Sequence, residues 1–98
     1  MRQVAVQRKL QDLQSRVTAL RAEIVVLSEQ IEVIDEEVED LRVRAVVSET
    51  PLAAKEHAAA ARHAALAHRA KLEAMENVAR LEHERDELLD QLAVEVAP

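Results

Sequence analysis

The side chains best suited to chemistry in this chain are its histidines, and their spacing argues against a metal site. Successive histidines are separated by six, five and fifteen residues, as His57, His63, His68 and His83. Two imidazoles on one helix need a spacing of about four residues to bind the same zinc ion. The sequence contains no His-Glu-x-x-His and no Glu-x-x-His, the signatures of zinc proteases and di-iron bundles. We therefore expect no metal and no cofactor.

Other catalytic groups lack the sequence context that they need. The serines are Ser15, Ser28 and Ser48, and the chain contains no glycine and no cysteine. Without glycine there is no nucleophile elbow and no phosphate-binding loop, and without cysteine there is no thiol catalysis. Carboxylates are abundant, but no pattern places two of them in a cleft. We expect a protein that is not an enzyme.

Composition narrows the possible partners. The chain has 98 residues, a net charge of -6 and no aromatic residue. Single-stranded nucleic acids are usually bound by aromatic stacking and positive charge, so nucleic acid is a disfavoured partner. No run of 18 apolar residues is present, so we expect no membrane span, and the N-terminal residues have no signal-peptide pattern. The default localisation is cytoplasmic.

The elements that must position any functional surface are long helices. Apolar residues in the first half recur at alternating steps of three and four, the a/d pattern of a coiled coil. These residues are the predicted interaction seam of the first helix: Leu10, Leu13, Val17, Leu20, Ile24, Leu27, Ile31, Ile34, Val38, Leu41 and Ala45.

One interior proline interrupts the helical pattern. Proline is tolerated at the first position of a helix, and Thr50 before Pro51 is a good N-cap. The sequence predicts a single helical-hairpin domain over residues 1–98, with a helix over about 3–47, a turn at 48–50 and a second helix over about 51–94. The alternative is one continuous helix kinked at Pro51. The predicted hairpin tip comprises Val47, Glu49, Thr50, Pro51 and Leu52.

The second helix offers two apolar stripes instead of one clear seam. The first stripe is Ala54, Ala58, Ala61, Ala65, His68, Leu72, Met75 and Ala79; the second is Leu52, Ala59, Leu66, Ala70, Ala74, Val78, Leu81, Leu88 and Leu92. We expect the larger residues to complete the seam, namely Leu72, Met75, Val78, Leu81, Leu88 and Leu92. His68 lies in the first stripe, where it is expected opposite Ile31 and able to tune stability with pH.

Charge blocks favour a partner for the first helix within its own chain. Each helix begins basic and ends acidic, so a fold at the turn places opposite blocks side by side. A parallel dimer of the first helix would instead place its acidic block against its own copy. We therefore predict an all-α antiparallel coiled-coil hairpin, with Glu37 near Arg62 and Lys9 near Asp90.

Leftover apolar residues on the first helix indicate a further contact surface. They include Val25, Val26, Val33 and Val43, outside the seam. A lone two-helix hairpin has a thin core, so we expect a homodimer of hairpins that forms a four-helix bundle. The function expected of such a protein is that of a scaffold, spacer or adaptor that binds another protein.

A second functional hypothesis comes from the hairpin outline. It resembles acidic-tipped hairpins that enter RNA polymerase, which implies a small regulator that inserts its tip into a larger complex. Those hairpins present paired carboxylates at the tip, whereas Glu49 is the only acidic residue there in this chain. The pattern assigns the chain to no family.

Overall fold

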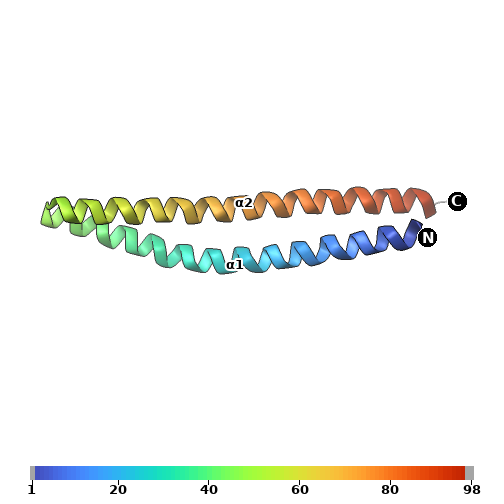
Figure 1. The fold of residues 1–98 in the computed structure, drawn as a ribbon, viewed down its shortest axis with the longest axis horizontal. Helices are drawn as coiled ribbons and strands as arrows, with labels where there is room; N and C mark the ends of the chain where they lie inside the picture. Colours follow the sequence, from blue (N-terminus) through green and yellow to red (C-terminus); the bar gives the residue numbers. More distant parts are fainter. Residues whose placement is uncertain (1, 97–98) are drawn as a thin grey trace. The chain divides into compact units, whose positions relative to one another are not determined.

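The computed structural model of this protein describes residues 2–96 and contains two long α-helices joined as a helical hairpin (Figure 1). Helix α1 spans Arg2–Ser48 and helix α2 spans Pro51–Val96, and no strand occurs in this described part. Alanine, leucine, glutamate and arginine favour helix, and the chain has no glycine to interrupt it. The all-helical prediction is confirmed. The alternative of one helix kinked at Pro51 is wrong.

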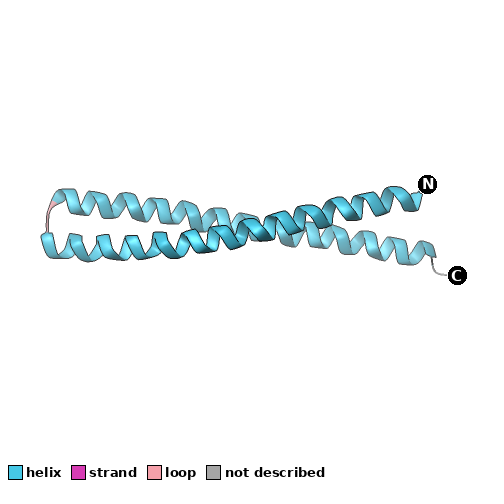
Figure 2. Ribbon diagram, turned by 90° about the horizontal axis from the view of Figure 1, so that it is seen from below, coloured by secondary structure: helices cyan, strands magenta, loops and turns pink. Residues whose placement is uncertain are grey.

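The turn between the helices has only two residues, Glu49 and Thr50 (Figure 2). Helix α1 extends through Ser48, whose Oγ donates to the Arg44 carbonyl oxygen at 2.7 Å. The Glu49 amide donates to the Ala45 carbonyl oxygen at 3.1 Å, and Glu49 has a left-handed φ of 53°. The Thr50 hydroxyl accepts from the Ala53 amide at 3.2 Å, which confirms the predicted N-cap.

The chain divides into two compact units. Unit 1 combines the N-terminal part of α1, through Glu23, with the C-terminal part of α2 from Ala74. Unit 2 is the continuous segment Ile24–Glu73, which includes the turn. Their buried residues are few: Leu13, Val17, Ala74, Val78 and Leu81 in unit 1, and Ile31, Ala53 and Ala64 in unit 2.

The apolar repeat of α1 lies on the side that meets α2. Leu13, Val17 and Ile31 are buried, and the other eight positions of the repeat are half-buried. Val6 is also half-buried and extends the repeat by one step toward the N-terminus. Ser28 is half-buried beside the seam, and its Oγ donates to the Ile24 carbonyl oxygen at 2.7 Å.

The inward side of α2 follows a strict repeat that neither predicted stripe describes. Its positions are buried or half-buried at steps of three and four residues: Ala53, His57, Ala60, Ala64, Ala67, Lys71, Ala74, Val78, Leu81, Arg85, Leu88 and Leu92. Lysine and arginine at such positions bury their aliphatic stems and keep the charge in water. No four-residue step is repeated in succession, so this seam has no stutter.

Two residues assigned to the seam of α2 are therefore misplaced. Leu72 is 56% exposed and Met75 is 49% exposed, whereas Val78, Leu81, Leu88 and Leu92 are buried or half-buried. The misplacement arises because Lys71 and Ala74, instead of the adjacent Leu72 and Met75, occupy the inward positions in this part of α2. The first stripe is exposed except for Ala61, and the second is exposed as far as Ala70.

Candidate interaction surfaces

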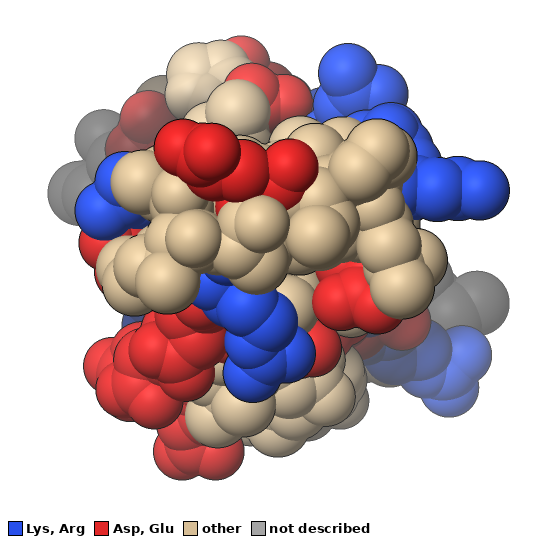
Figure 3. All heavy atoms as spheres, turned by 90° about the vertical axis from the view of Figure 1, so that its left-hand side faces the viewer, with Lys and Arg blue, Asp and Glu red and all other residues tan. Residues whose placement is uncertain are grey.

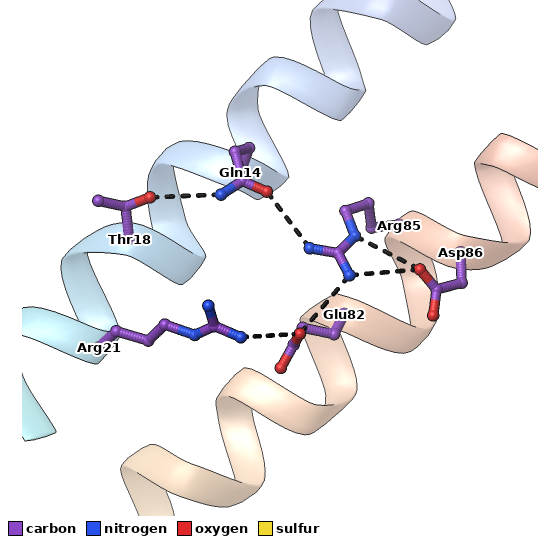
Figure 4. A network of polar contacts seen from close by, with 6 residues as sticks. All are labelled: Gln14, Thr18, Arg21, Glu82, Arg85 and Asp86. Carbon is purple, nitrogen blue, oxygen red and sulfur yellow. Dashed lines mark hydrogen bonds and ion pairs between the residues drawn. The ribbon is translucent and has the colours of Figure 1, made fainter.

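Unit 1 holds a polar network that joins its two helical segments along one edge (Figure 4). Arg21 Nη2 donates to Glu82 Oε2 at 2.9 Å. The guanidinium of Arg85 lies 3.5 Å from Glu82 Oε2 and 3.4 Å from Asp86 Oδ1, and it donates to Gln14 Oε1 at 3.3 Å. Arg85 is an inward position, so its contacts satisfy a charge that lies at the edge of the core.

A second ion pair in unit 1 joins Arg2 to Glu95 at 3.3 Å. These pairs match the expected meeting of the basic start of α1 with the acidic end of α2. The expected neighbours Lys9 and Asp90, however, form no ion pair within 4.0 Å in the part of the chain that the structure describes. Each exposed pair contributes roughly 0–1 kcal/mol to stability. The main effect of these pairs is therefore to favour one alignment of the two helices over the others.

In unit 2, a single polar contact joins the two helices among the described residues. His68 Nε2 lies 3.0 and 3.1 Å from the two carboxylate oxygens of Asp35. Both side chains are about half exposed, at 53% and 50%. His68 is therefore not opposite Ile31 in the seam, because it lies one position outside the inward repeat. Its influence on stability with pH stays a prediction.

The acidic block of α1 forms no ion pair with the lysines and arginines of α2 in unit 2. Within residues 24–73, no carboxylate lies within 4.0 Å of Lys55, Arg62, Arg69 or Lys71. Glu37 and Arg62, which we expect to be neighbours within about a turn, accordingly form no ion pair. Arg62 lies about 200° around α2 from the centre of its inward side, so its side chain is directed away from α1.

One acidic residue of α1 finds its partner on the same helix. Glu39 Oε1 and Oε2 accept from Arg42 Nη2 and Nε at 2.7 and 2.9 Å. The hydrogen bond from Arg42 lowers the pKa of the Glu39 carboxyl, and the bond to Glu39 raises the pKa of Arg42. This local pairing leaves Glu39 turned along its own helix instead of toward α2.

The turn end of unit 2 presents an exposed apolar tip. Val46, Val47 and Leu52 are exposed by 64%, 78% and 66%. The other predicted tip residues, Glu49, Thr50 and Pro51, are exposed as well. Figure 3 views this end and shows mostly uncharged surface nearest the viewer, with acidic groups set into it.

Chemically reactive clusters are not part of these surfaces. Over residues 2–96, no three histidine or carboxylate side chains lie close enough to hold one metal ion. His83 and Glu87 form a 3.0 Å pair on the same helix, and no third ligand joins them. Neither described helix has a stretch with the length and hydropathy needed to cross a membrane.

Sequence reasoning missed the role of Lys71 and Arg85 as inward positions of α2. A cation at an a or d position of a coiled coil is unusual. The signal in the sequence was that Lys71 continues the steps of three and four residues that Ala64, Ala67 and Ala74 follow. Comparisons with protein families, with curated proteins and with solved structures find no match for this chain.

Proposed function

We propose that this chain is a non-enzymatic coiled-coil protein that acts as a scaffold, spacer or adaptor through helix–helix association. In this proposal α1 and α2 form an antiparallel coiled coil, and two copies assemble into a four-helix bundle. The proposal is supported by the matching strict repeats on the two helices, because steps of three and four residues are the pattern of knobs-into-holes packing.

The observation that carries the association is an imbalance between core and surface. Only eight apolar residues are buried in the described chain, and three of them are alanines. Thirteen large apolar residues are exposed, among them Val33, Leu66 and Leu72. A small domain with so little buried surface generally needs a further partner to be stable, and exposed apolar surface beyond scattered single residues marks contact sites.

Sedimentation equilibrium of the full chain tests the self-association. The chain mass is 11.0 kDa, so the dimer is expected at twice this mass in the micromolar range. A monomer at high micromolar concentration would contradict the four-helix bundle.

Pull-down from the native source tests the adaptor role. Leu27→Asp places a charge in the seam and should abolish capture of partners, because α1 no longer packs on α2. Gln30→Asp introduces the same charge at an exposed position of the same helix and should leave capture intact. Equal capture by both variants would contradict a role that depends on the seam.

A second candidate is a small regulator that inserts its hairpin tip into a larger complex such as RNA polymerase. The exposed valines at the end of α1 and exposed Leu52 support it, because an apolar tip suits insertion into a groove. Val46→Asp should then abolish binding without loss of helicity measured by circular dichroism. Under the scaffold proposal the same variant keeps its partners.

A further inference from the structure

One side of unit 2 carries exposed apolar residues spaced by seven residues or by a multiple of seven. On α1 they are Val26, Val33 and Val47, with Asp40 at the position between the last two, and on α2 they are Leu52, Ala59 and Leu66; together we call these six apolar residues the outer Leu–Val face. Seven residues are two helical turns, so the residues within each set lie in a line along their helix. All six side chains are exposed, Val33 and Leu66 by 66% and 64%.

The two lines flank the same groove. Glu37 and Leu41 of α1 and Glu56 and Ala59 of α2 line a shallow groove between the helical segments of unit 2. Val33 lies one turn before Glu37 on α1, and Ala59 itself lines the groove on α2. The contact of Asp35 with His68 marks the opposite edge of the unit, because Asp35 is two residues, about 200°, from Glu37.

Charges next to the two lines are opposite in sign. Along α2, Lys55, Arg62 and Arg69 recur every seven residues beside Leu52, Ala59 and Leu66. Along α1, the exposed acids Glu29 and Glu36 lie three residues after Val26 and Val33, and Asp40 lies within the line itself. None of these six groups has an ion-pair partner in the described part of the chain. Each helix therefore carries exposed charges of the sign that attracts the other helix. Within one hairpin these charges form no ion pair with the other helix.

We propose that a second copy of this chain covers the outer Leu–Val face, with α2 of each copy lying on α1 of the other. This inference rests on the self-association proposed above and specifies its surface. A twofold axis parallel to the helices pairs basic α2 with acidic α1 twice and closes the assembly as a dimer. The other twofold arrangement of the same face places acidic α1 against its own copy, which repulsion disfavours.

The opposite face of unit 2 suits a second copy less well. There α2 offers Ala58, Ala65 and Leu72, and the same side of α1 carries Val25 and Val46 with the acids Glu32 and Asp35 between them. The outer Leu–Val face has five exposed valines and leucines in this unit, whereas the opposite face has three, Val25, Val46 and Leu72. In this arrangement Glu37 and Glu56, which line the groove, lie between the two lines of contact.

A pair of matched leucine substitutions tests the face. Leu66→Asp and Leu72→Asp change the same residue type at similar exposure on one helix. Sedimentation equilibrium should show the dimer dissociation constant raised about tenfold or more by Leu66→Asp, from the lost burial of one leucine. Leu72→Asp should change it by less than about threefold. Circular dichroism of both variants, at equal concentration, checks that helicity is retained.

The outcomes separate this inference from the proposal beneath it. If the wild-type chain is a monomer at all concentrations, the proposed self-association itself is wrong. A wild-type dimer that is weakened by Leu72→Asp and not by Leu66→Asp, or equally by both, would overturn only the assignment of the face.

Charge reversal gives an independent test that does not touch the apolar residues. Arg62→Glu with Arg69→Glu should weaken the dimer about tenfold, because two acidic surfaces then meet. Adding Glu29→Arg and Glu36→Arg to the same chain should restore the dissociation constant to within about threefold of the wild type. A fourfold variant as weak as the double variant would overturn the pairing of α2 with α1 of the other copy.

Discussion

The backbone of Glu49 is the clearest point of strain in the described chain. Its φ of 53° is the only positive φ among the described residues. Glu49 directly follows the last residue of α1, a position where glycine is the usual residue. The Glu49 amide still donates to the Ala45 carbonyl oxygen at 3.1 Å. Glu49→Gly should therefore stabilise the protein, because it removes the Cβ that the left-handed conformation disfavours.

The expected gain follows from two opposing terms. A left-handed residue with a Cβ costs about 1–2 kcal/mol, and glycine removes that cost. Glycine also makes the unfolded chain more flexible, which takes back about 0.5–1 kcal/mol. The difference between these terms is about 0–1.5 kcal/mol in favour of glycine, and its middle value of about 0.75 kcal/mol corresponds to a rise in Tm of roughly 3–6 °C for a chain of this size.

Thermal unfolding followed by circular dichroism at one fixed protein concentration measures this shift. Glu49→Ala is the matched control, because it removes the same exposed side chain and keeps the Cβ. We expect Glu49→Ala to stay within about 0.5 kcal/mol of the wild type. Equal Tm values for the glycine and alanine variants, or a less stable glycine variant, would refute the assignment of strain to this position.

Three further predictions concern packing and charge. Leu81→Ala should cost about 2–5 kcal/mol in urea unfolding because Leu81 is 1% exposed, whereas Leu72→Ala, at an exposed position, should cost less than about 1 kcal/mol. Lys71→Leu should raise the free energy of unfolding by about 1 kcal/mol, since an inward apolar residue replaces a cation that has no ion-pair partner; an unchanged urea midpoint would contradict this. The pair of Glu39 and Arg42 should stabilise the fold above the ordinary glutamate pKa and lose this effect as the pH falls through the lowered pKa of Glu39. NMR titration should show that pKa return upward in Arg42→Gln.

The extent to which sequence predicts this fold differs between the two helices. On α1 every inward position from Leu10 to Leu41 is a large apolar residue, and the unbroken steps of three and four residues make the repeat visible without coordinates, even beside Val25, Val26 and Val33. On α2 the inward Ala53 and Ala64 stand beside the outward Ala54 and Ala65, and nothing in the residue type distinguishes them. Only the position of α1 decides which alanines are covered.

Predicted charge contacts differ in the same way between the two units. The sign of each block correctly indicates which segments attract, and Arg21 meets Glu82 because both lie next to the seams of their helices. Arg62 has the right sign and the right neighbouring block, but it lies on the outward side of α2. The charge of a block can be read from the sequence. Whether a side chain in that block reaches the other helix depends on the angle of its residue around its own helix.

The sequence by itself determined that this protein is two helices with one turn, because helix propensity, proline and the Thr50 cap act through neighbouring residues alone. The tertiary structure decided which side of α2 is covered, and hence that Leu66 and Leu72 are exposed while small alanines lie inside. The physical reason is that burial belongs to a pair of surfaces, and an alanine-rich helix offers several sides of nearly equal apolar character until its partner is in place.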